Sequence, residues 1–514
     1  MTAQIDEAAK RLPSNLPCRY TLTSAVEFRE LAKSMRAAGG RFLTLWGADD
    51  RDRDGRFRVY AAFLDAAGLL VVEHDMHGGA EPLLPSLGEF FPSAVRMERA
   101  VFDLLGIRSL EPDHRGWLRH GGWPEDVFPL RRDFDSSAQF GMVSEPYPFV
   151  QVEGEGVHEI AVGPVHAGTI EPGHFRFSVV GEKVLRLEQR LGYKHKGIEK
   201  RFESLVQKEG HTLAARICGD SAVAYAWAYS AALEAVTGVI CPPRGVQLRA
   251  LALEHERLAN HLGDLGALGN DAGFAFGLTQ FSRMKEDLLR TNQACFNARY
   301  LMDFVVPGGV VSDLPDADPR SVLDRYNLLE HDVVGLRNIY DNHAGVQDRF
   351  RGTGTLARET AWELDAAGLA ARASGVPHDL RADFPWQPYD KMNVNVSTQA
   401  SGDVAARVSV RFDEVLESLR ICRALLADLQ AGDIRRAVPS AGAGLLGIGV
   451  IEGWRGPVLI ALETGPNGSI RRCHAHDPSW QNWPLIEYAI LGNLVPDFPL
   501  INKSFNLSYT GHDL

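Results

Sequence analysis

The sequence has few cysteines for its length: six in 514 residues, with no two of them forming a CxxC pair. They are Cys18, Cys218, Cys241, Cys295, Cys422 and Cys473. This scarcity argues against a secreted disulfide scaffold and favours a reducing compartment such as the cytosol. It also leaves no set of cysteines that would hold an iron–sulfur cluster within the chain.

Positive charge and long apolar runs are scarce as well. Lys and Arg total 54 against 66 Asp and Glu, a net charge of -12, which argues against a general nucleic-acid binder. Residues 221–243 carry a single acidic residue, Glu234, and are rich in Ala with Tyr, Trp and Ser among them, so we expect a buried helix rather than a membrane span. Residues 1–17 contain neither an apolar core nor a twin arginine, so no export signal is expected there.

The apolar share of 45% is that of a folded protein, and the residue patterns predict the α+β fold class. Strand-like runs at 42–46, 57–60 and 69–73, with helical spacing from Met97 to Leu105 before Gly106, predict a small α+β domain over residues 1–135. Residues 111–155 are rich in Pro, Gly, Asp and aromatics, and we assign 136–156 to a linker or arm lying over another surface.

From residue 157 the pattern becomes mainly helical. Short strands are expected at 158–162 and 175–180. Helices are expected over 185–207, 221–239, 248–268, 279–303 and 404–429. Residues 157–514 are therefore expected to form a mainly helical domain with short β elements at its two ends.

Two familiar motifs occur without the context that their chemistry needs. Gly442 to Gly447 fits GxGxxG, but no clear strand precedes it and a β-like segment follows, so a dinucleotide site is rejected. His255 and His261 are six residues apart and point to different sides of a helix, whereas zinc-binding histidines in HExxH are four apart. A structural role in a helix is expected for both histidines.

Four segments in a fixed order carry a resemblance to known proteins. ERAVFDLLGI (98–107) with FPLRRDF (128–134) resembles the 30-kDa subunit of respiratory complex I. GPVHAGTIEPGHFRF (163–177) and GYKHKGIEK (192–200) are similar to the 49-kDa subunit of complex I and to the large subunit of group 4 [NiFe]-hydrogenases. RICGDS (216–221), and EGWRG (452–456) with DPSWQN (477–482), resemble further motifs of those hydrogenases. The chain is identified as a member of this family in its fused form, seen in the large subunits of formate hydrogenlyase and hydrogenase-4.

The resemblance implies a [NiFe] centre held by four cysteine thiolates, but the sequence departs from that pattern. Cys218 is kept, while Ser221, Ser479 and Asn482 take the other three positions. A hydroxyl or an amide does not replace a bridging thiolate, which is a soft donor. We therefore expect no metal at this site, no hydrogen activation and no maturation cleavage of the tail after Cys473.

The resemblance also implies roles for polar residues around the vacated site. Glu171 matches the glutamate that relays protons in hydrogenases, His174 the histidine near the quinone headgroup in complex I, and Arg455 the arginine over the hydrogenase metals. The cavity is expected to be lined by these three and by Cys218, Asp220, Ser221, Ser479 and Asn482. Such a cavity would protonate a reduced organic acceptor. The alternative is a buried polar network without turnover.

Three further assignments stay open. The quinone-binding tyrosine of complex I falls near Gly219 or Asp220, and Tyr225 either replaces it or simply packs in the core. Cys218 is either a plain buried thiol or a redox-sensitive one. Glu254, Arg257 and His261 share one helix face and are expected to form a structural ion-pair network, with a proton path as the alternative.

The resemblance implies the large subunit of a hydrogenase-4-like or complex I-like oxidoreductase on the cytoplasmic face of the plasma membrane. Its expected partners are a small iron–sulfur subunit, antiporter-like and anchor membrane subunits and further electron-input subunits, with iron–sulfur clusters on the partner only. The acceptor would be an electron carrier such as quinone, and electron transfer would drive ion movement. The isolated chain is expected to be inactive. A non-catalytic coupling subunit and a hydrogenase with unusual ligands are the alternatives.

Overall fold

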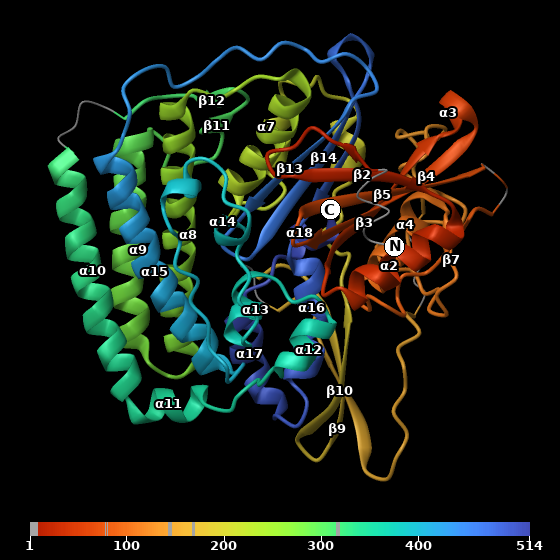
Figure 1. Ribbon diagram of the computed structural model, residues 1–514. Coiled ribbons are helices and arrows are strands. Elements are labelled where there is room, and N and C mark those ends of the chain that lie inside the picture. The colour runs from red at the N-terminus through yellow and green to blue at the C-terminus, as the bar shows by residue number, and fades with distance from the viewer. Residues whose placement is uncertain (1–8, 78, 80, 142–145, 167–169, 315–318) are drawn as a thin grey trace.

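A computed structural model describes residues 9–77, 79, 81–141, 146–166, 170–314 and 319–514. A twisted sheet lies beside a bundle of long helices, and a second sheet lies between them (Figure 1). The predicted α+β class is confirmed. Residues 167–169 of the GPVHAGTIEPGHFRF motif and 142–145 of the predicted arm lie outside the described residues.

The N-terminal part is built on a five-stranded sheet with the order β1-β2-β5-β4-β3. Its strands are β1 (Lys10–Arg11), β2 (Cys18–Thr23), β3 (Arg41–Asp50), β4 (Arg56–Asp65) and β5 (Gly68–His77), with helices α2 (Ala25–Ala37), α3 (Arg51–Asp54) and α4 (Ala94–Leu105). The three predicted strands and the predicted helix are confirmed. Gly106 ends α4 with a φ of 72°, a left-handed conformation that glycine adopts without strain.

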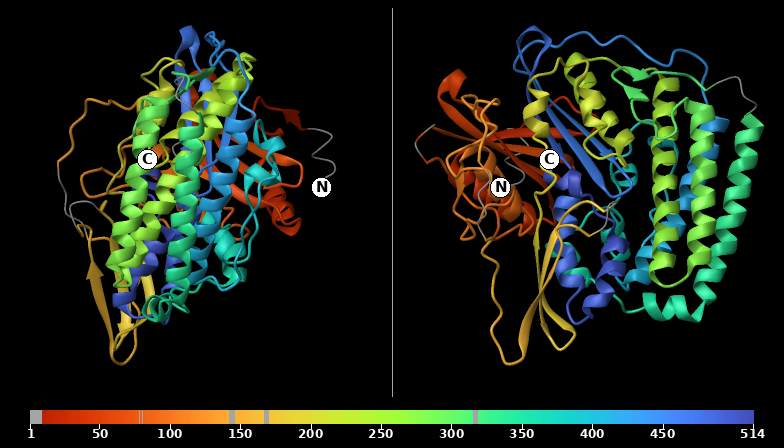
Figure 2. Two further views of the ribbon diagram at one scale, coloured as in Figure 1. Left: turned by 90° about the vertical axis from the view of Figure 1, so that its left-hand side faces the viewer. Right: turned by 180° about the vertical axis from the view of Figure 1, so that it is seen from behind.

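Two short strands, β6 (Leu83–Leu84) and β7 (Arg108–Ser109), come before residues 110–156, which we call the arm and which include the predicted linker at 136–156. Between residues 110 and 156 the described residues form neither helix nor strand. The arm leaves the N-terminal sheet and runs along the outside of the molecule to a three-stranded sheet (Figures 1 and 2). That sheet consists of β8 (Val157–Val162), β9 (His174–Val180) and β10 (Lys183–Arg190), in the order β10-β9-β8.

The prediction of a helix over residues 185–207 is wrong. Residues 183–190 form strand β10, paired antiparallel with β9 from Lys183 opposite Val180 to Arg190 opposite His174. Gly192 and Gly197 then take positive φ values of 93° and 62°, which break any helix before the short α5 (Ile198–Phe202). Pairing with β9 overrides the helical spacing of the leucines.

The second half contains long helices that lie side by side (Figure 2). They are α7 (Ala222–Thr237), α8 (Pro243–Asp271), α9 (Ala275–Phe296), α10 (Pro319–Asn342) and α15 (Val404–Ala427). Helix α9 ends before the predicted Asp303 because Asn297 takes a left-handed φ of 53°. Helix α10 is not among the predicted elements.

None of the helices in the described part of the chain has both the length and the apolar character that crossing a membrane requires.

A second sheet connects the helices to the N-terminal part. Strands β13 (Leu446–Glu452), β14 (Pro457–Thr464) and β15 (Ile470–His476) pair antiparallel in chain order. Residues before β2 extend this sheet, since the Ile448 N–H donates to the Pro13 carbonyl (2.9 Å) and Asn15 bonds both backbone groups of Val450. The remaining elements are β11 (Val305–Val306), β12 (Gly309–Val310), α6 (Gly210–Ala214), α11 (Ala344–Phe350), α12 (Arg358–Glu363), α13 (Gly368–Ala373), α14 (Leu380–Asp383), α16 (Ser479–Ala489), α17 (Phe498–Phe505) and α18 (Tyr509–Asp513).

Helix α7 packs directly on β13, and glycine makes this approach possible. A Cβ on Gly449 would lie 1.8 Å from the Ala228 carbonyl oxygen. We expect Gly449→Ala to lower the free energy of unfolding by about 3 kcal/mol, because backbone atoms on both sides must move apart. Thermal unfolding checks this. Gly335→Ala on α10, where a Cβ meets no atom within 4 Å, is the control and should be neutral or slightly stabilising.

Candidate functional site

Cys218 lies in the loop before α7 and is buried. Its Sγ–H donates to Asp220 Oδ1 (2.8 Å), Ser508 Oγ lies 3.0 Å away, and Arg455 Nη1 donates to Sγ at 3.6 Å. Burial raises the pKa of this thiol far above its ordinary value, with Asp220 adding to the shift. Cys218 is thus a buried thiol held by hydrogen bonds.

Arg455 and Asp220 form a two-pronged ion pair. Arg455 stands in the turn between β13 and β14, and its two Nη atoms lie 2.7 and 2.5 Å from the Asp220 carboxylate oxygens. Its Nε donates to the Asn506 carbonyl (2.5 Å), and its guanidinium lies 4.0 Å from the centre of the Trp454 ring. Every nitrogen of the Arg455 guanidinium therefore has a partner within the chain. The Asp220 side chain is still 37% exposed, so the pair is in contact with solvent.

Ser479 and Asn482 begin helix α16 and hold backbone segments in place. The Ser508 N–H donates to Ser479 Oγ (2.9 Å). The Asn482 side-chain amide accepts from the Ala367 N–H (2.9 Å) and donates to the Ala367 carbonyl (3.1 Å). Ser221 is buried at the start of α7, 3.4 Å from Asp220. Cys218, Asp220, Ser221 and Arg455 thus form one hydrogen-bonded network, to which Ser508 links Ser479. Asn482 bonds only the backbone of Ala367.

The donor set at this site does not fit a [NiFe] centre. It offers one thiol whose pKa is raised, two hydroxyls and an amide engaged with backbone groups. Low-valent nickel bridged to iron requires several thiolates, which are soft and deprotonated. The chemistry that these residues can carry is that of hydrogen bonds and proton exchange.

Glu171 lies at the edge of this network. It accepts from the Thr510 N–H (3.2 Å), and Lys194 Nζ lies 3.9 Å from its other oxygen. Burial raises the pKa of Glu171 above its ordinary value, while the Thr510 N–H and two lysines oppose the shift. A half-buried carboxyl of this kind can exchange a proton with solvent.

His174 lies apart from the Cys218 network, on the wall of a cavity of about 700 Å³ between the arm and the β8–β10 sheet. Its Nδ1 bonds the Gly163 carbonyl (3.1 Å), which only accepts, so Nδ1 carries the proton. Its Nε2 is buried with no hydrogen-bond partner among the described residues. Burial lowers the pKa of His174, so the ring is neutral and Nε2 is a free acceptor.

The residues of the arm around this cavity are absent from the predicted site. The arm and neighbouring strands line it with aromatic and basic groups: Arg115, Arg119, His120, Trp123, Tyr147, Phe149, Arg190 and Tyr193. Phe149 packs on the His174 ring (5.1 Å between centres), and Arg190 lies 4.5 Å from the Tyr147 ring centre. The aromatic-rich composition of residues 111–155 is the sequence signal that marks this lining.

Tyr225, His255 and the GxGxxG segment lie outside the Cys218 network. Tyr225 is buried and donates to Asp477 Oδ2 (2.7 Å), so it lies in the core beside the network. His255 bonds Asn292 (2.6 Å) and Tyr326 (2.5 Å), in agreement with a structural role. The GxGxxG segment leads into β13 rather than into a helix. Among the residues that the structure describes, no group of three or more His, Cys, Asp or Glu is placed to hold a metal ion.

Comparison with known proteins identifies the family. Residues 22–140 match the respiratory-chain NADH dehydrogenase 30 Kd subunit, and residues 271–443 match the 49 Kd subunit. Formate hydrogenlyase subunit 5 of Escherichia coli is 30% identical over 92% of this chain and 85% of its own length. The chain belongs to this family of fused complex I-type and hydrogenase subunits. Hydrogenase-4 component G of E. coli is also 30% identical, over 91% of this chain and 83% of its own length.

One further relative is named as a fusion, and one solved structure shares the fold. The C/D fusion protein of NADH-quinone oxidoreductase from Phocaeicola vulgatus is 28% identical over 75% of this chain and 78% of its own length. A chain of the archaeal membrane-bound sulfane sulfur reductase superimposes with a TM-score of 0.66 and 24% identity, covering 70% of this chain and 99% of that one. The latter likeness supports the fold alone.

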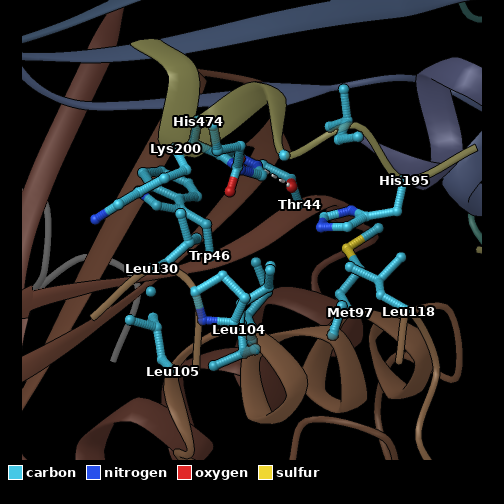
Figure 3. A pocket seen from close by; sticks show the side chains of 18 of the residues that line it. Thr44, Trp46, Met97, Leu104, Leu105, Leu118, Leu130, His195, Lys200 and His474 are labelled. Carbon is cyan, nitrogen blue, oxygen red and sulfur yellow. Dashed lines mark hydrogen bonds and ion pairs between the residues drawn. The ribbon is translucent and has the colours of Figure 1, made fainter. Parts of the chain in front are cut away.

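The two fused parts of this complex I-type chain meet at β3 and β15. His474 donates from Nδ1 to Glu199 (2.5 Å) and lies 2.9 Å from Thr44 Oγ1, and its ring stacks on Trp46 with 4.9 Å between centres. Figure 3 shows His474, Thr44 and Trp46 around a small pocket closed by apolar side chains such as Leu104. The volume of this pocket is only about 50 Å³, which is too small for a substrate. We therefore assign the pocket to the contact between the two fused parts.

Proposed function

We propose that this chain is the large subunit of a membrane-bound, complex I-like or hydrogenase-4-like oxidoreductase. Electrons arrive from the iron–sulfur clusters of a small partner subunit that is itself fed by electron-input subunits. Antiporter-like and anchor subunits hold the chain at the cytoplasmic face of the plasma membrane and move ions. The relatives support this assignment, since they are named as formate hydrogenlyase, hydrogenase-4 and NADH-quinone oxidoreductase subunits.

The electron acceptor, a quinone or similar carrier, binds in the cavity between the arm and the β8–β10 sheet. One observation carries this placement: the unpartnered Nε2 of His174 belongs to a residue on the wall of a cavity lined by aromatic rings. Aromatic walls suit a flat organic ring, and a small number of polar groups fix its orientation. In turnover His174 takes a second proton at Nε2, gives it to the reduced acceptor and returns to the neutral form, in which Nδ1 donates to the Gly163 carbonyl.

Glu171 and Arg190 have separate places in this proposal. Glu171, half-buried beside Lys194 at the edge of the Cys218 network, exchanges protons with solvent. Arg190 lines the cavity and donates to the carbonyls of Gly116 (2.9 Å) and Trp117. It has no carboxylate within ion-pair distance among the described residues, so its charge favours a reduced, anionic acceptor.

The closed Arg455–Asp220 pair supports a second candidate function. Because Arg455, Cys218, Ser479 and Asn482 bond to one another or to backbone, they present no free group to a ligand. In this alternative the chain is a non-catalytic coupling subunit that transmits conformation between its partners.

Substitution of His174 separates the two functions. We expect His174→Ala, in the assembled complex, to lower the rate of reduction of a short-chain quinone by about 100-fold, because proton transfer from the ring is lost. His158→Ala, on exposed β8 of the same sheet, is the matched control and should leave the rate unchanged.

Each result decides between the proposals. An unchanged rate in His174→Ala would support the coupling subunit and reject the acceptor site. Stoichiometric nickel in the same purified complex would reject both and restore a hydrogenase with unusual ligands.

A further inference from the structure

A cluster of buried charged side chains lies between helices α8, α13, α14 and α15 and the end of strand β13. We call it the acid cluster, and its members are Glu254, Arg257, His261, Arg372, Asp379, Arg381, Glu414 and Glu452. None of these side chains is more than 5% exposed. The cluster includes the predicted network of Glu254, Arg257 and His261, which the observed contacts confirm.

The acid cluster contains four carboxyl groups but only three guanidinium groups. His261 does not supply the missing charge. Its Nε2 donates to Glu414 (2.7 Å), its Nδ1 has no partner among the described residues, and burial lowers its pKa. With a neutral imidazole, four carboxylates would leave one net negative charge buried. Such a charge is costly to bury, so one carboxyl group holds a proton.

Contacts identify Glu452 as the proton-holding group. Glu254 accepts from Ser418 (2.6 Å) and Tyr389 (2.7 Å) as well as Arg381, whereas Glu452 has only two long contacts of 3.3 Å, from Arg372 and the Leu380 N–H. Burial, followed by the nearby Asp379, raises the pKa of Glu452 to about 7. The pKa values of Glu254, Asp379 and Glu414 are lowered instead, because their arginine partners outweigh burial.

Each cation that faces Glu452 among the described residues also has another carboxylate partner. Asp379 and Arg381 face it from the α14 side, Arg372 from α13 and Arg257 from α8. Arg41 faces it from β3 but is bound to Asp383 at 3.3 Å. Arg411, next to Glu414 on α15, is bound to Asp264 at 3.0 Å. Asp264 also binds Lys503 (3.1 Å), whose side chain is 31% exposed. Arg41 and Arg411 thus each have a carboxylate outside the cluster, and the surplus cation beside Asp264 is the partly exposed Lys503.

Glu452 ends strand β13, directly before the turn that carries Arg455. Arg257, a member of the acid cluster, donates to the Glu452 carbonyl (2.9 Å) and to the Gly453 carbonyl (3.2 Å). The turn is closed by a bond from the Gly453 N–H to the Gly456 carbonyl (2.9 Å). At its far side Arg455 binds Asp220. A change of charge on Glu452 therefore acts on the same arginine that fixes this turn.

We propose that Glu452 is a proton-holding positioning residue, which keeps one proton in the resting subunit and, on losing it, shifts the turn that presents Arg455 to Asp220. The proton goes to water and no electron moves. The carboxylate that forms attracts Arg257 and Arg372, which hold the turn and the acid cluster together. The effect of this shift on turnover rests on the proposed function, whereas the proton on Glu452 does not.

Infrared titration of the full chain tests the proton directly. We expect the wild type minus Glu452→Gln difference to show the C=O stretch of a protonated carboxyl group at about pH 5.5 and to lose it by about pH 8.5. Glu452→Gln should fold, because an amide has the shape of the neutral acid. Glu452→Asp, which keeps a carboxyl group, should restore a titrating band. Absence of the band in the difference spectrum would overturn the proposal.

The matched control is Glu98→Gln in helix α4. Glu98 is buried with a pKa that burial raises to about 7, but its partners are Ser109 and the Leu87 N–H in the N-terminal part. This variant should remove its own infrared band and leave the Glu452 band in place. In the assembled complex, Glu452→Gln should flatten the pH profile of quinone reduction near neutrality, and Glu98→Gln should not.

The outcomes separate this proposal from the proposed function. A titrating band with an unchanged pH profile in Glu452→Gln would overturn the positioning role. If His174→Ala has no effect on turnover while the Glu452 band titrates as expected, the acceptor site fails and the proton on Glu452 stands.

Discussion

Arg381→Met should destabilise the chain by about 3–5 kcal/mol, one of the two largest effects that we expect, because it takes the nearest cation from two buried carboxylates. Arg381 donates to both oxygens of Glu254 (3.0 and 3.2 Å) and forms a two-pronged contact with Asp379 (3.0 and 2.7 Å). All three side chains are at most 2% exposed. Methionine fills the volume of the side chain but supplies no charge. Chemical and thermal unfolding of the purified chain measure the loss.

The sign of the pH dependence gives a second measurement on the same variant. Without Arg381 the folded-state pKa values of Glu254 and Asp379 rise above their unfolded values, since burial then dominates. The folded state would bind more protons, so the deficit of Arg381→Met relative to wild type should shrink as the pH falls. Adding Glu254→Gln should recover part of the loss, because it removes one of the unpaired charges.

A surface ion pair provides the control for Arg381. Arg283 on α9 binds Asp332 at 2.6 Å, but its side chain is 47% exposed. Arg283→Met should change the free energy of unfolding by less than about 0.5 kcal/mol, since water replaces its contact. Equal losses in the two variants would contradict the argument that burial, rather than the contact itself, sets the cost.

The elements that periodicity predicts well are those whose partners lie close in the sequence. Helices α7 and α15 and the β3–β4–β5 meander have patterns that are locally consistent. The sequence of strand β10 is ambiguous because its spacing also fits a helix, and only pairing with β9 decides between them. Helix α10 carries a readable signal in Tyr326, Leu329, Val333, Leu336 and Tyr340, which are buried at helical spacing.

The candidate site shows a similar limit. The motifs locate Cys218, Asp220, Arg455 and Ser479, and the structure brings Arg455 to Cys218 and Asp220 across more than 200 positions of sequence. The sequence does not reveal that their hydrogen bonds close on one another, nor that His174 faces a separate cavity under the arm. Both features depend on the path of segments without helix or strand, for which no periodicity exists.

Glu199 provides the other large expected effect, at the contact between the two fused parts. Its carboxylate accepts from Arg472 Nη2 (2.8 Å), His474 Nδ1 (2.5 Å) and the Ala475 N–H (3.3 Å). Arg472 also donates to the Gly47 carbonyl on β3 (3.0 Å). Glu199→Gln would leave the buried Arg472 cation unpaired. We expect a loss of about 3–5 kcal/mol and faster proteolysis within residues 111–155, because the N-terminal sheet is held less firmly.

Acid sensitivity tests whether the charge of Glu199 is responsible. Burial alone would raise the pKa of Glu199, but Arg472 and His474 outweigh it and lower that pKa to about 2. A carboxyl whose folded pKa is depressed stabilises the fold above its unfolded pKa, and this contribution of about 3 kcal/mol is lost as the pH falls from about 4.5 through 2. Over this pH range the free energy of unfolding of the wild type should therefore fall toward that of Glu199→Gln. The control is Glu159→Gln, at the partly exposed pair with Arg176, which should match the wild type at every pH. A constant gap between wild type and Glu199→Gln down to the lowest pH would show that packing, not the ion pair, holds the two parts together.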